Sequence, residues 1–437
     1  MADKYKIQGG TQLKGEVNIG GAKNAVLKLM AAAVLAEGET KIYNVPELTD
    51  VGIMLEVING LGIKTSYDKK AKSVSIDASN ITSVTAKYEY VSKMRASFTI
   101  LGALVSRCKE AIVALPGGCA IGERRVDFHI KGLEALGAKI KIENGYVHAK
   151  APKLVGADIY LDIPSVGATE NLMFAAILAE GSTRIQNAAQ EPEIIDLANF
   201  LNTMGADIVG AGTSEIIING VKQSDLHPIE YTTIPDRIEA GTFMTAVVAS
   251  KGKAIIKNVF PAHLTFFTDK LIKMGASIKL IEPTAIEVSC KNRLNSLNFV
   301  TQPYPGFPTD LQSMAMALLT TANGVGIITE SLYENRFMQV PHLLRMGADI
   351  HQDRNHAIIK GVKKLTGATV SASDLRAGAS LVVAAIMADG TSTIENLHHI
   401  DRGYENFDTK LRALGANIIR YNDETEEAKG LQNESRV

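Results

Sequence analysis

Cysteine and net charge are both scarce in this sequence, and long apolar runs are missing. Three cysteines among 437 residues are too few for a disulfide framework, so we expect free thiols and a cytoplasmic location. A formal net charge of −1 gives no reason to expect nucleic acid or an anionic membrane as a partner. The most apolar stretches, such as residues 381–388, are far shorter than the roughly 20 residues of a membrane-spanning helix.

The two ends of the chain are polar. Charged residues begin at Asp3 and Lys4, so we expect no signal peptide. Residues 422–437 are polar, include Glu424, Glu426 and Glu427, and are expected to form a disordered tail. Between these ends, a hydrophobic content of 46% is sufficient to bury two sizeable cores.

One unit of about 70 residues is repeated six times along the chain. Each copy contains a Leu-Gly or Met-Gly pair, which ends a helical pattern and precedes a strand pattern. The glycines of these pairs are Gly62, Gly137, Gly205, Gly275, Gly347 and Gly415. Their spacings of 75, 68, 70, 72 and 68 residues predict a repeat architecture.

A second glycine precedes five of these pairs by 23 to 25 residues. These glycines are Gly38, Gly181, Gly252, Gly324 and Gly390. The second unit departs from the rule, because Lys109 takes the place of the glycine, 28 residues before Gly137. Its additional residues fall in the segment 116–125. Because a repeat builds a scaffold, we expect the residues that carry out the chemistry to lie where the repeat is broken.

Two kinds of helix are predicted in each unit. Helices of the first kind are apolar almost all round and must be buried: residues 25–35, 96–105, 171–179, 242–249, 313–320 and 378–387. Helices of the second kind, such as residues 51–61 and 195–204, have one apolar stripe and are expected to cover sheets from outside. Six buried helices are too many for one core. We therefore predict an α/β fold of two domains, each with three buried helices surrounded by short sheets.

The sixth unit stops early. It ends with the strand pattern at residues 417–421 and lacks the last strand pair of the fifth unit. Residues 7–15 have the spacing of that pair, so we expect the N-terminus to complete this domain. The predicted domains are residues 21–229, and residues 1–20 with 230–421.

Alignment of the six units brings unusual side chains to equivalent places. Those before the buried helices are Lys23, Asn24, Arg95, Ser165, Val166, Gly167, Asp236, Arg237, Asp310 and Arg376. Those before the amphipathic helices are residues 119–124, Glu191, Glu193, His263, Arg336 and Arg402. A cation at a helix N-terminus opposes the helix dipole by about 0.3–1 kcal/mol, so repeated cations there indicate a shared anionic ligand. Surface or interdomain ion pairs are the alternative interpretation.

Cys119 is the strongest candidate for a reactive group. Gly117 and Gly118 favour an accessible loop, and the guanidinium groups of Arg124 and Arg125 favour the thiolate form of a nearby cysteine. Most free cysteines are small buried side chains, and we interpret the other two cysteines in this way.

Two other positions allow a structural and a functional interpretation. Ser165 opens the third buried helix, where it either caps the helix or helps to hold a diphosphate. Asp310 either caps the fifth buried helix or removes a proton from a substrate hydroxyl. No metal site is evident, because His398 and His399 are adjacent at an expected strand end, where their rings would point to opposite sides.

Four motifs stand out between Lys6 and Tyr421, at residues 21–24, 116–124, 334–337 and 399–404. With these motifs the chain resembles the UDP-N-acetylglucosamine 1-carboxyvinyltransferase branch of the enolpyruvyl transferase family. The resemblance implies two inverse α/β barrel domains, each of three repeated units with buried central helices. It also implies that the enolpyruvyl group of phosphoenolpyruvate passes to the 3′-hydroxyl of UDP-N-acetylglucosamine and that phosphate leaves. This is the first committed step of peptidoglycan synthesis, and it needs no metal or organic cofactor.

The resemblance further implies binding roles. Lys23, Arg124 and Arg402 would hold the phosphate of phosphoenolpyruvate, and Arg336 and Arg376 would support its carboxylate. The residues that would line the nucleotide-sugar site are Asn24, Arg95, Asp127, His129, Ser165, Val166, Gly167, Asp310 and Leu332.

The catalytic set implied by the resemblance is Cys119, Asp310, Lys23 and Arg402. Asp310 would accept the proton of the attacking hydroxyl, and Cys119 would act either as an acid on the enol carbon or as a nucleophile. Two alternatives remain at this point: a 5-enolpyruvylshikimate-3-phosphate synthase, against which the Cys119 loop argues, and a non-catalytic paralogue that binds the nucleotide sugar. The sequence leaves the oligomeric state open.

Overall fold

The computed structural model describes residues 3–116 and 126–422, which fall into two compact units. Within these residues the first unit consists of residues 21–116 and 126–234, and the second of residues 3–20 and 235–422. The first unit extends to Ile234 rather than to residue 229, because β14 (Glu230–Thr232) pairs in parallel with β3 (Glu39–Tyr43). The predicted tail lies outside the described residues, apart from Asn422.

Each unit contains three four-stranded sheets of one design, in which an edge strand pairs in parallel with the next strand and the remaining pairs are antiparallel. The sheets of the first unit have the orders β14-β3-β5-β4, β6-β7-β9-β8 and β10-β11-β13-β12, and those of the second have β2-β15-β17-β16, β18-β19-β21-β20 and β22-β23-β1-β24. The other strands of the first unit are β4 (Lys64–Asp68), β5 (Ser73–Asp77), β6 (Thr85–Ala86), β7 (Glu110–Ala114), β8 (Lys139–Glu143), β9 (Tyr146–Lys150), β10 (Asp158–Tyr160), β11 (Ser182–Gln186), β12 (Asp207–Val209) and β13 (Glu215–Asn219). The strands of the second unit are β1 (Lys4–Gln8), β2 (Lys14–Asn18), β15 (Lys253–Lys257), β16 (Ser277–Glu282), β17 (Ala285–Ser289), β18 (Phe299–Val300), β19 (Val325–Thr329), β20 (Asp349–Asp353), β21 (His356–Lys360), β22 (Thr369–Ser371), β23 (Thr391–Glu395) and β24 (Asn417–Tyr421).

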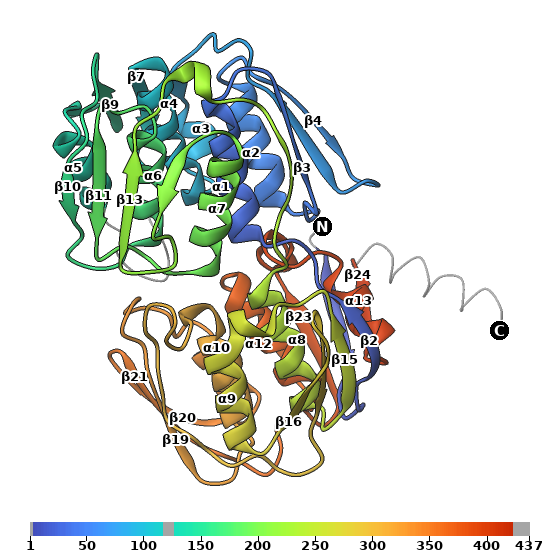
Figure 1. Ribbon diagram of the computed structural model, residues 1–437. Coiled ribbons are helices and arrows are strands. Elements are labelled where there is room, and N and C mark those ends of the chain that lie inside the picture. The colour runs from blue at the N-terminus through green and yellow to red at the C-terminus, as the bar shows by residue number, and fades with distance from the viewer. Residues whose placement is uncertain (1–2, 117–125, 423–437) are drawn as a thin grey trace. The chain divides into compact units, whose positions relative to one another are not determined.

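Three buried helices form the centre of each unit. Figure 1 shows them among the surrounding sheets. They are α1 (Lys23–Ala32), α4 (Ile100–Cys108) and α6 (Val166–Ala176) in the first unit, and α8 (Arg237–Ala249), α10 (Gln312–Leu319) and α12 (Leu375–Met387) in the second. Nearly every residue of these helices is buried, and their side chains make up much of each hydrophobic core. None of the helices in the described part of the chain is long and apolar enough to cross a bilayer.

The amphipathic helices lie at the edges of the sheets. Each packs against the outermost strand of its own repeat. They are α2 (Thr49–Asn59), α5 (Asp127–Ala135), α7 (Pro192–Thr203), α9 (Thr265–Met274), α11 (Val340–Arg345) and α13 (Phe407–Ala413). The remaining helical segments are α3 (Tyr88–Val91), η1 (Ala33–Leu35), η2 (Arg95–Thr99), η3 (Gln223–Asp225), η4 (Pro261–Leu264), η5 (Thr309–Leu311) and η6 (Leu397–Arg402).

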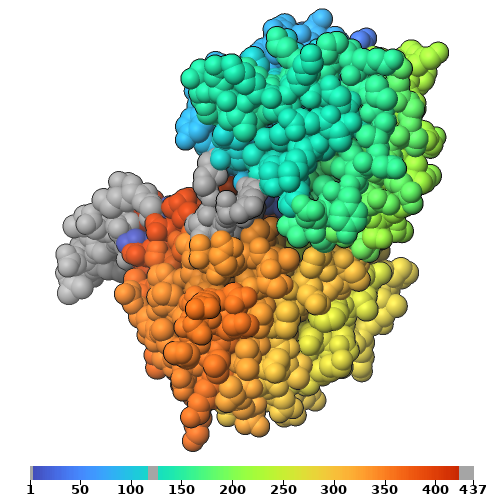
Figure 2. All heavy atoms as spheres, turned by 90° about the vertical axis from the view of Figure 1, so that its left-hand side faces the viewer, coloured from blue at the N-terminus to red at the C-terminus, as the bar shows by residue number. Residues whose placement is uncertain are grey.

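The expectation that amphipathic helices cover the sheets from outside is wrong. The outward side chains of β11, such as Ser182 and Arg184, are exposed, and so are those of β19 and β21. In Figure 2, orange atoms from the part of the chain that carries β18 to β21 cover much of the visible face of the second unit. The apolar stripes instead contact central helices and edge strands, as α7 does with α1 and β12.

The N-terminal strand belongs to the sheet of the sixth repeat. β1 lies between β23 and β24, and Ile7 is in register with Ser392 on one side and Ile418 on the other. Tyr5 and Ile7 are fully buried. β2 then pairs in parallel with β15, so the first residues of the chain hold two sheets of the second unit.

Candidate active site

Asp310 lies between two arginines in the second unit. It belongs to η5, directly before α10, and its Oδ1 accepts a hydrogen bond from Arg336 Nη2 at 2.7 Å. Its Oδ2 accepts from Arg376 Nη2 at 2.9 Å and from Arg376 Nε at 3.2 Å. The two arginines come from different repeats, so the structure brings together three of the residues that the repeat alignment singled out.

Charge complementarity dominates this cluster. Burial tends to raise the pKa of Asp310, but the positive charges of Arg376 and Arg336 outweigh it and hold the pKa well below its usual range. The side chain of Asp310 is 25% exposed, whereas those of Arg336 and Arg376 are 7% and 2% exposed. The carboxylate is therefore the accessible member of the cluster, and the guanidinium groups lie behind it.

One nitrogen of the Arg376 guanidinium is buried without a hydrogen-bond acceptor in the described part of the chain. Arg376 is the second residue of α12, whose N-cap, Asp374, accepts hydrogen bonds from the backbone N–H groups of Arg376 and Ala377. The guanidinium carbon lies 5.3 Å from the centre of the Tyr404 ring. Its Nη1 is buried and has no hydrogen-bond acceptor among residues 3–116 and 126–422. A buried donor of this kind is costly unless a ligand satisfies it.

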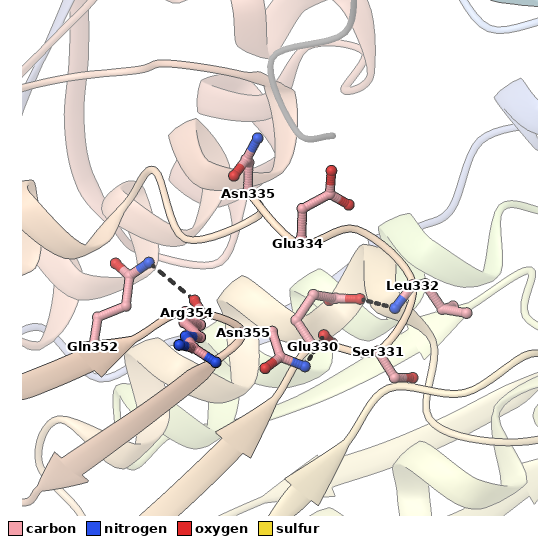
Figure 3. A pocket seen from close by; sticks show the side chains of 8 residues that line it. All are labelled: Glu330, Ser331, Leu332, Glu334, Asn335, Gln352, Arg354 and Asn355. Carbon is pink, nitrogen blue, oxygen red and sulfur yellow. Dashed lines mark hydrogen bonds between the residues drawn. The ribbon is translucent and has the colours of Figure 1, made fainter. Parts of the chain in front are cut away.

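A polar cavity of about 480 Å³ is lined in part by the segment that precedes Arg336 in the sequence (Figure 3). It is lined by Glu330, Ser331, Leu332, Glu334, Asn335, Gln352, Arg354 and Asn355. Leu332 is 36% exposed, and its backbone N–H donates to Glu330 Oε1 at 2.9 Å. The cavity lies wholly in the second unit, at the ends of β19 and β21.

Arg402 ends the 3₁₀ helix η6 and is half-buried. The preceding residue, Asp401, accepts hydrogen bonds from Arg420 Nη1 and Nη2 at 2.9 and 2.7 Å, which fixes the turn. His398 and His399 lie in this helix and not at a strand end, so the prediction that their rings point to opposite sides is wrong. Successive residues of a 3₁₀ helix are about 120° apart, and the two ring centres are 4.1 Å from each other.

Lys23 is the first residue of α1 in the first unit. Its Nζ lies 2.7 Å from Asp50 Oδ2, and both side chains are almost fully buried. Asp50 stands in the first turn of α2, so it also favours that helix electrostatically. The adjacent Asn24 is exposed.

His129 is a neutral, buried ring in α5. Asn171 Oδ1 accepts from the backbone N–H of Gly102 at 2.6 Å, so Asn171 Nδ2 donates to His129 Nδ1, 2.8 Å away. The ring proton is therefore on Nε2. Burial, with smaller contributions from Arg95 and Lys28, lowers the pKa of His129 to about 3.

The start of α6 faces that ring. Ser165 is the N-cap, and its Oγ accepts from the backbone N–H of Ala168 at 3.4 Å. A Cβ atom placed on Gly167 would lie 3.4 Å from His129 Cε1, so Gly167 leaves space for the imidazole. Asp127, the first residue of α5, has a buried Oδ1 without a hydrogen-bond partner among the described residues. Val166 follows Ser165 as the first residue of α6 and is half-buried.

Sequence reasoning missed a buried ion pair between two central helices. Lys28 Nζ of α1 contacts Glu170 Oε2 of α6. Burial raises the pKa of Glu170 to about 7, and Glu193 and Glu191 add to this, against the attraction of Lys28. The signal in the sequence was limited to Lys28 inside the predicted apolar helix 25–35, because Glu170 stands one residue before the predicted helix 171–179.

Cys119 and Arg124 lie outside the described residues. The other two cysteines carry no disulfide, and burial raises the pKa of both thiols, Cys108 and Cys290. Among the described residues, no three side chains of the metal-binding types are arranged to hold an ion.

Comparison with known proteins gives the family. The model of the EPSP synthase (3-phosphoshikimate 1-carboxyvinyltransferase) family matches residues 7–411. The chain is 53% identical, over 96% of its length and all of the relative's, to UDP-N-acetylglucosamine 1-carboxyvinyltransferase 2 of Carboxydothermus hydrogenoformans. It is 50% identical, over 96% of its length and 91% of the relative's, to UDP-N-acetylglucosamine 1-carboxyvinyltransferase of Gloeobacter violaceus.

Solved structures with a similar fold include enolpyruvyl transferases. The enolpyruvyl transferase NikO from Streptomyces tendae superposes with a TM-score of 0.87 at 26% identity, covering 96% of this chain and 99% of NikO. EPSP synthase from Acinetobacter baumannii shares the fold, with a TM-score of 0.71 at 18% identity over 96% of this chain and all of the synthase. With a mixed α/β fold and relatives at half identity over nearly its whole length, the chain belongs to the enolpyruvyl transferase family.

Proposed function

We propose that this chain is a UDP-N-acetylglucosamine 1-carboxyvinyltransferase. It transfers the enolpyruvyl group of phosphoenolpyruvate to the 3′-hydroxyl of UDP-N-acetylglucosamine and releases phosphate. The observation that carries the proposal is the buried pair of guanidinium groups on either side of Asp310, with Nη1 of Arg376 unoccupied by any acceptor of the described residues. Such a pair suits an anionic donor beside a group that accepts a proton.

The donor binds to cations from several repeats. Arg336 and Arg376 hold its carboxylate, and Lys23, Arg124 and Arg402 hold its phosphate. Guanidinium groups fixed in this way stabilise the charge that is redistributed when the hydroxyl attacks C2 and a tetrahedral intermediate forms.

Asp310 is the proton acceptor in this proposal. In the ligand-free cluster its pKa is too low for a strong base, because two arginines stabilise its charged form. A donor carboxylate on the same guanidinium groups competes for their charge and so raises the pKa of Asp310. The base therefore becomes effective when the donor is bound. Cys119 serves either as the acid for the enol carbon or as a nucleophile that forms a transient adduct.

Two sets of residues are proposed to bind the nucleotide sugar, one in each unit. Those of the first unit are Asn24, Arg95, Asp127, His129, Ser165, Val166 and Gly167, and those of the second are Asp310 and Leu332. The neutral imidazole of His129 offers its Nε2–H as a donor, and Ser165 offers a hydroxyl beside the free N–H groups of a helix start.

The same proposal covers the architecture and the setting of the protein. Each unit is an inverse α/β barrel, in which three repeats place their helices at the centre and their sheets outside. The enzyme acts in the cytoplasm on two small molecules and uses no metal or organic cofactor.

Phosphate release tests this function directly. With phosphoenolpyruvate and UDP-N-acetylglucosamine, the protein is expected to release phosphate and to form the enolpyruvyl ether of the sugar nucleotide. With phosphoenolpyruvate and shikimate 3-phosphate, release is expected to stay at the background rate. Release only with shikimate 3-phosphate would favour the synthase alternative, and release with neither acceptor would favour a non-catalytic paralogue.

Alkylation by the epoxide fosfomycin, a phosphoenolpyruvate mimic, is expected at Cys119 and not at the other cysteines. The thiolate is the reactive form, and burial raises the pKa of Cys108 and Cys290, which keeps both as thiols near neutral pH. Intact-mass analysis should show one adduct, and peptide mapping should place it in the segment 116–125. Modification of Cys108 or Cys290 in the native protein, with Cys119 untouched, would refute this assignment.

A further inference from the structure

Glu330 is a buried carboxylate that connects two parts of the candidate site. It directly follows β19 and is 1% exposed. Its Oε1 accepts from Thr301 Oγ1 at 2.7 Å, from Leu332 N at 2.9 Å and from Tyr333 N at 3.1 Å. Its Oε2 accepts from Thr309 Oγ1 at 2.9 Å. Both oxygens thus accept hydrogen bonds from within the protein.

The hydrogen bonds continue from Thr309 to Arg336. Because the Thr309 hydroxyl donates its one proton to Glu330, its oxygen is left as an acceptor, and Arg336 Nη1 donates to it at 2.9 Å. Arg336 Nη2 is then directed to Asp310. The hydrogen bonds thus run in one direction, from the guanidinium group of Arg336 to the Thr309 hydroxyl and from that hydroxyl to Glu330.

The same carboxylate shapes the wall of the cavity. The N–H group of Leu332 donates to Oε1, as Figure 3 shows. The N–H group of Tyr333 donates to the same oxygen, which folds residues 330–333 into a tight turn. The backbone of Glu330 is fixed as well, because its N–H donates to Asn355 O at 2.8 Å and its C=O accepts from Asn355 Nδ2 at 3.1 Å. Thr301 also holds the turn, because its Oγ1 accepts from the backbone N–H of Ser331 at 2.8 Å. The Glu330 side chain therefore contacts both the turn and, through Thr309, an arginine of the donor site.

We propose that Glu330 is a positioning residue that holds Arg336 through Thr309 and holds the turn at Leu332 and Tyr333 directly. It does not touch the substrates. Its effect on catalysis rests on the proposed function, in which Arg336 binds the carboxylate of phosphoenolpyruvate, whereas its effect on the turn does not depend on that function.

Glu330→Gln is the informative variant because it keeps the size of the side chain. One oxygen becomes an NH₂ group, which cannot accept from Thr309 or, if the amide is flipped, from Leu332 and Tyr333. Hydrogen bonds to charged groups contribute enough that the KM for phosphoenolpyruvate is expected to rise about 10- to 100-fold, with kcat changed much less. Thr309→Val should raise this KM similarly, and Thr309→Ser should restore it. The double variant Glu330→Gln/Thr309→Val should have a KM no higher than that of either single variant.

Hydrogen exchange separates the turn from the chemistry. The amides of Leu332 and Tyr333 should exchange faster in Glu330→Gln than in the wild type and in Thr309→Val. Asp353→Asn, which removes an exposed carboxylate of the same sheet, should leave both exchange and KM unchanged. Wild-type exchange and wild-type KM in folded Glu330→Gln would overturn the proposal. If the wild type itself gave no turnover, the proposed function would fail, and exchange at residues 332 and 333 alone would decide the positioning role.

Discussion

Asp310→Asn is expected to lower turnover by about 10²-fold or more, the usual scale for the loss of a general base. The amide cannot take up the hydroxyl proton. It also no longer competes with the donor for Arg336 and Arg376, which Asp310 contacts at 2.7 and 2.9 Å. The KM for phosphoenolpyruvate should therefore stay the same or fall, and affinity for UDP-N-acetylglucosamine should remain within a few-fold.

Steady-state kinetics and nucleotide-sugar titration measure this combination. Asp353→Asn is the matched control, because it removes one carboxylate from the exposed end of β20 without touching the arginine cluster. Unchanged turnover together with collapsed nucleotide-sugar binding would make Asp310 a binding or capping residue only.

The repeat was predictable because it depends on backbone geometry that few residues adopt. The glycines of the Leu-Gly and Met-Gly pairs have positive φ, for example 84° at Gly62 and 92° at Gly415, where they end helices. Four of the five glycines that precede these pairs also have positive φ. Lys109, which takes the place of such a glycine in the second unit, has φ of 62° at the end of α4. The sequence thus revealed where the helices end.

The placement of the amphipathic helices was not predictable in the same way. An apolar stripe shows that one side of a helix is buried, but it does not say which element buries it. The stripe of α7 contacts α1 and the edge strand β12, so the helix lies beside its sheet. The predicted covering layer assumed that a sheet needs a helix on each face, whereas the exposed faces here carry residues such as Arg184 and Lys360.

The candidate site was predictable by position and not by partner. Alignment of the repeats placed Asp310 and the arginines at helix starts, but it could not say which arginines the carboxylate contacts. Glu330 gave no signal, because an acidic residue after a strand is common. Lys28 was visible within the predicted helix 25–35, but Glu170 lies just before the predicted helix 171–179 and 142 positions from Lys28, so the pairing was not predictable.

Lys28→Met is expected to lower the free energy of unfolding by about 3–5 kcal/mol, because it leaves Glu170 buried without its cation. Glu170 is fully buried and Lys28 is 8% exposed. For a domain of about 150–250 residues, each kcal/mol lost from the free energy of unfolding lowers Tm by about 2–4 °C. Calorimetry should therefore show a large fall in Tm. Lys153→Met breaks an exposed pair with Glu180 and should cost less than about 1 kcal/mol.

The pH dependence and the double variant identify the cause. The folded pKa of Glu170, about 7, lies above the ordinary value of 4.5, so the folded protein retains this proton to a higher pH than the unfolded chain. Stability from this group is therefore full below about pH 4.5 and lost as the pH rises through 7. Removal of Lys28 raises this pKa further, so the penalty should be smaller at pH 5 than at pH 8. Lys28→Met/Glu170→Leu removes both charges and should match or exceed the wild type, because apolar residues of similar volume often replace a buried ion pair without loss. A Tm for Lys28→Met equal to that of Lys153→Met at both pH values would show that the buried pair has no special role.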